Sequence, residues 1–483
     1  MDLEKAEKLT SPKAMAGEYR ASLGDTRLNR RQVATGKAIS SSPELSIPKL
    51  FPDEADAEAT YALLRNQDVA WRDQLQGHMD RTVARAVEAK DVLVAHDTTE
   101  VSYVRYWPDD KRKHMSMRTS HTQGFLLHTS LVARAEGAVA PLGVLDLQPF
   151  VHSSDIDTDD QETVDYWEGE GGLLDNEMRR WFRSVAVTQD LLSESGVKPI
   201  HLMDREGDSY GLLSWLAEMG YRFVVRCDAQ RGLRAVEPAR ELGEVTVALG
   251  ERFPNRTGEM SKSNPPRRAR QAILTIRSSV VELRRSSGRT EASWSPGGYD
   301  DQPRTLELHM VEAVERHPPA GERGVRWQLL TTEPIDTPEE VLKIVEYYRR
   351  RWLIEEYFKA LKTGCKLQER QMASMPNMLR MLALLVPAAW RLLLLRTVSI
   401  EMPLASWKRL LTPLEFKILS KAVPKAKLGA TSTVHQCMMA IAKLGGHFPH
   451  NGLPGWQTLQ AGWRRLHDML DGALLAAGLA INP

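Results

Sequence analysis

Five short apolar segments between residues 91 and 227 constrain the fold of this chain more than any other feature. Their sequences are VLVAHD, FLLHTSLVA, APLGVLDL, PIHLMD and YRFVVRC. Short runs rich in β-branched residues are typical of strands. Helical patterns over 177–194 and 209–219 lie among the last three segments. Strands mixed with helices in this order predict an α/β core, in which helices pack on a central sheet.

The segments on either side of this core have different patterns. Residues 1–75 contain short amphipathic helical stretches separated by prolines, 244–332 is again rich in strand patterns, and nearly everything after Pro338 is helical. We therefore expect three domains in this 483-residue chain. They are a helical domain over 1–75, an α/β domain over 76–372 with a β insertion at about 244–332, and a helical domain over 373–483.

Cysteine content and hydropathy indicate a cytoplasmic protein. The three cysteines are far apart and odd in number, which excludes a disulfide framework and a cysteine-rich zinc site. The N-terminus has no apolar signal core. The most apolar stretch, 378–395, is interrupted by Arg380 and Arg391. We expect it to be a buried helix rather than a membrane span, and we expect no membrane partner.

The net charge of +1 conceals a strong segregation of charge along the chain. Residues 155–177 include ten acidic and no basic side chains, whereas 256–289 include nine basic and two acidic ones. Whether a protein binds nucleic acid depends on where its charges lie, so the net charge decides nothing. The helical stretch 26–40 also carries a basic cluster. Such a cluster can contact phosphates, although a solvated helix face is its commoner meaning.

Two aspartates follow strong strand signals. Asp97 comes after VLVAH and Asp204 comes after IHLM, so we expect both near the carboxyl ends of strands. That edge of an open α/β sheet is where ligands gather. A lone aspartate after a strand more often caps the next turn. Two of them, together with the helix described next, favour a functional site.

The helix expected over 339–362 carries a polar stripe. At the helical advance of roughly 100° per residue, five of its side chains fall within an arc of about 80°. They are Tyr348, Arg351, Glu355, Lys359 and Lys362. We expect this stripe to face outward, while Leu353, Ile354, Tyr357, Ala360 and Leu361 pack on the core. An ordinary amphipathic helix with surface ion pairs is the alternative. The excess of cations over acids favours a groove that binds phosphates.

Phosphodiester chemistry explains why three acids would be brought together. Clustered carboxylates repel one another when they are empty. Two divalent ions remove that cost, and they stabilise both the attacking and the leaving oxygen of a phosphoryl transfer. Asp97, Asp204 and Glu355 are therefore candidate ligands for two Mg²⁺ ions.

These motifs resemble a known family. The spacing Y-x2-R-x3-E-x6-K, with HDTTEVSY around Asp97 and MDREGDSY around Asp204, is similar to the signature of the insertion-sequence-four family of bacterial DDE transposases. Further similarity runs from SLGDTRLNRR through RFVVR and WQLLTTEP to AIAKLGG. The resemblance implies a ribonuclease H-like catalytic core with a β-sheet insertion, flanked by helical domains for transposon-end recognition and dimerisation. It also implies cut-and-paste transposition through a 3′ nick, a DNA hairpin, hairpin opening and joining to target DNA.

The resemblance assigns roles to individual residues. Asp97, Asp204 and Glu355 would form the catalytic centre with two Mg²⁺ ions, for which Mn²⁺ can substitute. Trp327 would stack a flipped-out base, although alone it could equally be a core aromatic. The full set expected to contact DNA is Tyr348, Arg351, Lys359, Lys362, Arg226, Trp327 and Trp352 near the cleavage site, and Arg27, Arg30, Arg31 and Arg65 at the transposon end. The expected partners are double-stranded transposon-end and target DNA, and a second copy of the chain in a homodimer on DNA.

Two other functions stay open at this point. The first is a non-catalytic DNA-binding regulator of transposition, against which stands the presence of the N-terminal region and of all three acids. The second is a structure-specific nuclease on the same core, which hydrolyses DNA without joining it. The helix stripe alone does not separate a nuclease from a transposase.

Overall fold

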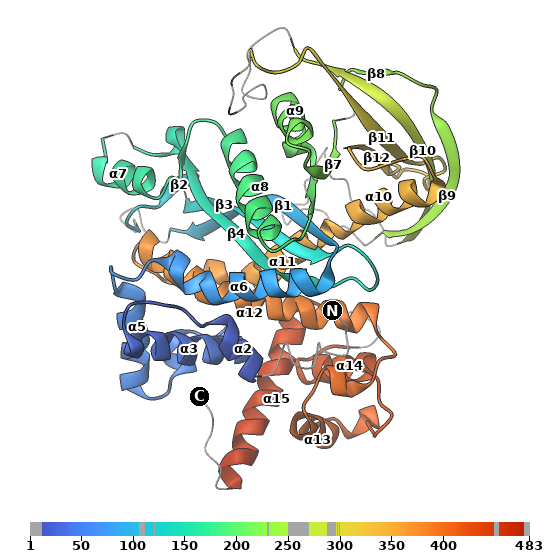
Figure 1. Cartoon of the computed structure of the whole chain (residues 1–483). Coiled ribbons are helices and arrows are strands. Elements are labelled where there is room, and N and C mark those ends of the chain that lie inside the picture. The colour runs from blue at the N-terminus through green and yellow to red at the C-terminus, as the bar shows by residue number, and fades with distance from the viewer. Residues whose placement is uncertain are drawn as a thin grey trace.

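Twelve strands among the residues that the structure describes form a mixed β-sheet at the centre of the computed structural model (Figure 1). Its strand order is β5-β4-β3-β1-β6-β7-β12-β11-β10-β8, with β2 paired to β3 and β9 paired to β10. The structure describes residues 12–105, 112–119, 121–157, 159–228, 231–249, 270–286, 296, 298, 300–448 and 454–477. The protein is thus a mixed α/β protein with a large sheet, as its strand and helix patterns predict.

The five predicted strands form the part of the sheet that carries Asp97 and that ends directly before Asp204. β1 (Val92–Val104), β3 (Thr122–Arg134) and β4 (Pro141–His152) are antiparallel neighbours. β6 (Ile200–Met203) and β7 (Arg222–Arg226) follow on the other side of β1 and run parallel to it. β1 begins with six consecutive buried residues because both of its faces are covered.

The strands expected over 244–332 extend this same sheet. They are β9 (Arg240–Leu249), β10 (Arg270–Arg284), β11 (Thr305–Glu315) and β12 (Arg326–Thr331), preceded by the short β8 (Leu233–Ala235). β12 pairs antiparallel with β7, which joins the insertion to the core. Much of the basic stretch 256–289 lies outside the described residues. The short strands β2 (Ser116–Thr119) and β5 (Leu173–Leu174) complete the sheet.

Helices cover both faces of the core strands (Figure 1). α8 (Met178–Ser193) and α9 (Tyr210–Glu218) lie on one face, and α11 (Trp352–Lys359) and α12 (Met375–Glu401) lie on the other. α10 (Pro338–Arg350) packs against β7 and β11. α7 (Gln161–Gly169) follows β4. The C-terminal helices are α13 (Pro413–Ala422), α14 (Val434–Leu444) and α15 (Trp456–Ala476).

α12 is the central helix of the C-terminal half. It is long and apolar enough to cross a membrane, but its most apolar window is fully buried inside the protein. The two arginines that interrupt its apolar sequence are buried and bind backbone carbonyl groups of the N-terminal region. Arg380 donates to Leu64 O and Val69 O, and Arg391 donates to Ser40 O. The expectation of a buried helix is therefore confirmed.

The N-terminal helices form a layer below α12 in Figure 1. They are α2 (Pro12–Glu18), α3 (Thr26–Ser41), α4 (Ile47–Leu50) and α5 (Glu54–Arg65), followed by α6 (Trp71–Ala89). Aspartates cap the N-termini of α3 and α5. The Asp25 and Asp53 side chains accept hydrogen bonds from the first free backbone N–H groups of these helices. α15 also reaches this layer through Gln460 and Arg464, which both bind the Glu44 carboxylate.

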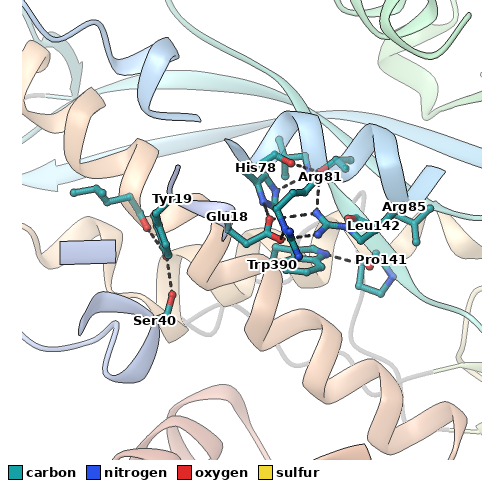
Figure 2. A network of polar contacts seen from close by, with 12 residues as sticks. Glu18, Tyr19, Ser40, His78, Arg81, Arg85, Pro141, Leu142 and Trp390 are labelled. Carbon is teal, nitrogen blue, oxygen red and sulfur yellow. Dashed lines mark hydrogen bonds and ion pairs between the residues drawn. The ribbon is translucent and has the colours of Figure 1, made fainter. Parts of the chain in front are cut away.

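A buried polar network joins these N-terminal helices to the α/β core (Figure 2). The Glu18 carboxylate is fully buried and binds His78 Nδ1, Arg81 Nε and Arg85 Nη1, each at 2.6 Å. The Arg85 guanidinium in turn lies 4.2 Å from the centre of the Trp390 ring. Glu18 therefore ties α2 to α6 and, through Arg85, to α12.

The same network protects the open edge of β4. Strand edges present unpaired backbone groups that need partners. Here the Val144 N–H donates to His78 Nε2 at 3.1 Å, Arg85 Nε donates to Leu142 O, and Trp390 Nε1 donates to Pro141 O at 3.1 Å. Since His78 Nε2 accepts a hydrogen bond, its proton is on Nδ1 and points at Glu18. Burial lowers the pKa of His78, which fits this neutral form.

Candidate active site

Asp97 lies in the middle of β1, where the neighbouring strand β6 ends. We expected it at the end of its strand, and this was wrong because β1 continues to Val104 in an antiparallel pair with β3. The residues after Asp97, TTEVSYV, include threonine, valine and tyrosine, which favour strands, and they belong to the arm of a hairpin. The pairing of β1 with β6 stops at Ala95 and Leu202. Asp97 is thus the second residue of β1 beyond this pairing.

Asp204 directly follows β6, as its sequence predicts. Its carboxylate accepts a hydrogen bond from the Glu206 N–H at 2.9 Å and begins a short 3₁₀ turn over Arg205–Gly207. The strand-end aspartate therefore does cap a turn. The same turn brings Glu206 close to Asp204. Burial raises the pKa of Glu206, and the nearby charge of Asp204 raises it further.

The predicted helix 339–362 is formed by α10 and α11, which Arg351 joins in a helical conformation. It ends in a π-helical turn over Ala360–Gly364. Its apolar face packs on the core as expected. The expectation that the whole polar stripe faces outward was wrong. Tyr348 and Arg351 are only 6% and 8% exposed, because this part of the helix packs against the sheet face that carries Asp97.

Arg351 connects two of the three acids. Its Nη1 lies 2.9 Å from Asp97 Oδ2, and its Nη2 lies 3.5 Å from Glu355 Oε1. Burial acts against the positive charge of Arg351, but nearby acidic groups outweigh it and raise the pKa of this side chain. These groups are Tyr348, Asp97, Asp204 and Glu355.

The three acids influence one another electrostatically. Burial raises the pKa of Asp97 first, Arg351 lowers it, and the charges of Asp204 and Glu355 raise it further, to about 7. This is well above the ordinary value of 3.8. The fold thus gathers Asp97, Asp204 and Glu355 around one partly shielded position that favours additional positive charge.

The carboxylates do not form a ready-made metal site in this arrangement. Within the described ranges, no three His, Cys, Asp or Glu side chains are placed to hold one metal ion. The Arg351 guanidinium contacts Asp97 and Glu355 instead. Carboxylate oxygens are nevertheless the donors that Mg²⁺ and Mn²⁺ prefer.

The two lysines of the stripe lie at different places. Burial lowers the pKa of Lys362, and the charges of Glu100 and Glu355 raise it, so Lys362 lies beside the acids. Lys359 is exposed, binds Glu356 at 2.7 Å and lies 5.2 Å from the centre of the Trp352 ring. Trp352 is itself 53% exposed. The Lys359–Trp352 pair therefore forms an exposed surface beside the acids, which a ligand can reach.

An aromatic and basic group flanks the acids on the insertion side. Trp327 on β12 is half-buried and packs edge-on against Tyr348, with ring centres 5.4 Å apart. Arg226 at the end of β7 lies close to Tyr348, whose pKa is raised by burial and lowered by Arg351 and Arg226. The charge of Asp204 also acts on Tyr348. Trp327, Arg226 and Tyr348 therefore border the acidic centre.

The N-terminal arginines lie apart from this centre. Arg27, Arg30 and Arg31 are on α3, and Arg65 ends α5. Arg27 and Arg30 are exposed, whereas Arg31 binds Asp56 at 2.8 Å and Arg65 binds Glu58. Any binding of DNA by these arginines would thus take place at a second surface of the protein.

Four side chains near the acids were not found from the sequence. Glu206 belongs to the motif MDREGDSY around Asp204, and its position in this motif was a usable signal that it lies near the acids. Arg180 on α8 is 2% exposed and lies 3.5 Å from Glu206, but nothing in its helix sequence pointed to this. Glu100 acts on Lys362. Thr129 pairs with Asp97 across the β1–β3 ladder, and its buried hydroxyl has no hydrogen-bond partner among the described residues.

Two models of known protein families match parts of the chain. Residues 18–69 match a transposase DNA-binding domain, and residues 184–390 match a transposase DDE domain. The first match contains the N-terminal arginines. The second contains Asp204, Glu355 and the whole segment from α10 to α11.

A transposase DDE domain that follows a transposase DNA-binding domain defines, in general terms, a DNA-cleaving and strand-transferring enzyme. The chain is a DDE transposase, and DNA is its partner. DDE transposases generally use divalent metal ions.

Proposed function

We propose that the protein is a cut-and-paste transposase of the insertion-sequence-four family, similar to the transposon-five transposase. It binds the ends of its transposon, nicks the 3′ strand, forms and opens a hairpin on the other strand, and joins the 3′ ends to target DNA. Its core is ribonuclease H-like, and support for this comes from the three antiparallel strands β4, β3 and β1 followed by the parallel strands β6 and β7. The enzyme works as a homodimer on DNA.

The observation that carries this proposal is the electrostatic coupling of Asp97, Asp204 and Glu355 beside Arg351. We propose that these three acids hold two Mg²⁺ ions, or two Mn²⁺ ions, once Arg351 releases them. Bound there, divalent ions supply the positive charge that stabilises the attacking and leaving oxygens of phosphoryl transfer. The high pKa of Asp97 and the unpartnered hydroxyl of Thr129 both fit a cation at this position, because ligand carboxylates are usually supported by a second hydrogen-bond donor.

The surrounding cations and aromatics would hold the DNA. Arg351 and Lys362 neighbour the acids and can bind the phosphates on each side of the scissile bond. Tyr348, Arg226 and Lys359 would bind phosphates further along the strand. Trp327 has a half-buried ring at the border of the site, and a base that leaves the DNA stack can pack on it. Trp352 is exposed and would fill the position which that base leaves.

The domain arrangement supports recognition of the DNA at two surfaces. We propose that 1–75 recognises the transposon end, with Arg27, Arg30, Arg31 and Arg65 on the DNA side. The catalytic domain spans 76–372, and the helices of 373–483 form the dimer. α15 is amphipathic and exposes Met469 and Leu475 near its C-terminal end, which supports a role in dimerisation.

The test uses a supercoiled plasmid that carries the genomic segment around the coding sequence, so that both transposon ends are present. With Mg²⁺, the purified protein should give nicked, hairpin-ended and strand-transfer products. Asp97→Ala, Asp204→Ala and Glu355→Ala should each abolish cleavage and keep end binding. The control variant Glu401→Ala, at the exposed end of α12, should cleave normally.

Two other outcomes would replace this proposal. A protein that binds the ends but never nicks them with Mg²⁺ or Mn²⁺ is a regulator of transposition. Strong cleavage without hairpins or joined products identifies a structure-specific nuclease.

A further inference from the structure

Three fully buried histidines lie behind the catalytic acids. They are His96 on β1, His128 on β3 and His201 on β6, and each is 0% exposed. Side chains alternate between the two faces of a strand, so His96 points away from Asp97. It points toward α8, since both His96 and His128 bind Ser184 of that helix. His96 and Asp97 thus share β1 but point to opposite faces of the sheet.

The hydrogen bonds of this layer have a defined direction. Gln189 Nε2 donates to Ser193, so its Oε1 accepts from His201 Nε2 at 3.0 Å. Both rings are fully buried, and the side chains to which they hydrogen-bond are serine, glutamine and one another, none of which carries a charge. Both rings are therefore neutral, with one donor and one acceptor each. His201 Nδ1 must accept from His96 Nε2, which lies at 2.9 Å.

The chain continues on the other side of His96. Its Nδ1 is left as an acceptor, and the Ser130 hydroxyl on β3 lies 2.9 Å away. His128 binds Thr98 Oγ1 at 2.9 Å with its Nδ1 and Ser184 Oγ at 3.0 Å with its Nε2. Side-chain hydrogen bonds therefore link β3, β1 and β6 to α8 at one level of the sheet.

This level is where the two catalytic strands lose their backbone pairing. β1 and β6 are paired through Leu93–Ile200, Val94–His201 and Ala95–Leu202. The His96–His201 bond crosses between the strands one residue before Asp97 and three residues before Asp204. It can therefore set the distance between the part of β1 that carries Asp97 and the end of β6 that precedes Asp204.

Apolar side chains could fill this layer at little cost in stability. Replacing both partners of a buried hydrogen bond by apolar groups of the same shape can be nearly neutral or stabilising. The directional bond is what histidines add to packing. A fixed separation of two metal-binding carboxylates has a functional use, since the ligands of a metal site must be held within about half an ångström of their productive positions.

We propose that His96 and His201 are positioning residues, and that their hydrogen bond fixes the spacing of Asp97 and Asp204 for divalent-ion binding. This inference rests on the proposed metal-binding role of the acids. It assigns no proton transfer and no contact with DNA to either histidine.

The test compares His96→Leu with His96→Gln. Leucine fills the space without a donor, whereas the glutamine amide nitrogen can donate to His201 Nδ1 in place of the ring Nε2. Binding of Mn²⁺ to the purified full-length protein is followed by electron paramagnetic resonance of free Mn²⁺. We expect His96→Leu to bind Mn²⁺ about 10-fold to 100-fold more weakly than wild type, as for lost supporting contacts in other metal sites. His96→Gln should recover most of the affinity.

Unfolding by urea is measured on the same samples. His96→Leu leaves His201 Nδ1 without its buried donor, so we expect this variant to lose stability. A purely structural role predicts wild-type Mn²⁺ affinity for the fraction of the variant that is folded, whereas the positioning role predicts weaker binding by fully folded protein. If His96→Leu does not fold, His201→Asn against His201→Leu gives the same comparison, because the asparagine Oδ1 can accept in place of Nδ1. Wild-type affinity in both leucine variants, or equally weak binding in the leucine and amide variants, would overturn the proposal.

Asp97→Ala separates this proposal from the proposed function. If it binds Mn²⁺ as wild type does, the acids are not the metal site and both proposals fail. If it loses binding while His96→Leu keeps it, the function stands and only the positioning role fails.

Discussion

Replacing Glu18 by glutamine removes the charge at the centre of the buried junction between the N-terminal helices and the core. The carboxylate is 0% exposed and is bound by His78, Arg81 and Arg85, each at 2.6 Å. Burial raises the pKa of Glu18, but the hydrogen bond from His78 and the charge of Arg85 outweigh burial and lower it from 4.5 to about 2. The native protein thus stabilises the charged form of Glu18, relative to the protonated form, more than the unfolded chain does.

The size of the effect follows from this difference. A shift from 4.5 to about 2 corresponds to roughly 3 kcal/mol of the free energy of unfolding at neutral pH. Loss of one partner from a buried ion pair costs about 3–5 kcal/mol, and glutamine keeps the shape and one acceptor. We therefore expect Glu18→Gln to lose about 3 kcal/mol. Because the native pKa is the lower one, this stabilisation is complete above about pH 4.5 and is lost as the pH falls toward 2.

Urea unfolding at pH 7 and pH 3 measures this prediction. Glu136→Gln is the matched control, since Glu136 pairs with Lys343 at 3.0 Å on the surface and both side chains are more than half exposed. Such pairs contribute about 0–1 kcal/mol. The reasoning is refuted if Glu18→Gln costs no more than Glu136→Gln at pH 7, or if its cost is the same at both pH values.

Three further predictions follow from the same structure. Asp97→Asn should raise stability in metal-free buffer by on the order of 2–4 kcal/mol at pH 8, since burial and the charges of Asp204 and Glu355 raise the Asp97 pKa to about 7. The cost of ionising Asp97 in the native protein grows between pH 3.8 and about pH 7, so the gain in stability should be smaller at pH 5. A variant that is less stable than wild type at both pH values contradicts this prediction. Arg380→Met should destabilise by about 2–3 kcal/mol in urea, because it leaves the carbonyl groups of Leu64 and Val69 without their buried donor, and an unchanged midpoint contradicts it. Trp327→Ala should spare first-strand nicking more than hairpin formation in a gel assay of end cleavage, whereas equal loss of both steps contradicts base stacking on this ring.

The parts of the fold that depend on local pattern could be predicted from the sequence. The buried strands are nearly continuous apolar runs, and α12 is an apolar helix whose two arginines did not exclude burial. The extension of the sheet by the insertion could not be predicted, because the pairing of β12 with β7 joins residues about a hundred positions apart. The length of β1 was also missed, although Thr98 and Thr99 favour strands, because Asp97 and Glu100 interrupt the apolar run.

The candidate site was predictable in its residues and less so in its arrangement. Helical spacing correctly placed Arg351 and Glu355 as neighbours on one face of a helix. Helical spacing did not predict that Tyr348 and Arg351 face the sheet, because tertiary packing decides which side of an amphipathic helix is covered. The histidine layer was missed for a similar reason. Its members come from three separate strands, and each histidine alone looks like an isolated core residue.

The central claim is that Asp97, Asp204 and Glu355 bind divalent ions together beside the scissile phosphate. Anomalous X-ray scattering from Mn²⁺, in crystals of the protein bound to a duplex that ends at the transposon terminus, tests it most directly. We expect manganese peaks in direct contact with all three carboxylates, and Arg351 moved from Asp97 to a DNA phosphate. Manganese bound elsewhere, or an Arg351 that still bridges Asp97 and Glu355 in the metal-loaded complex, would contradict the account.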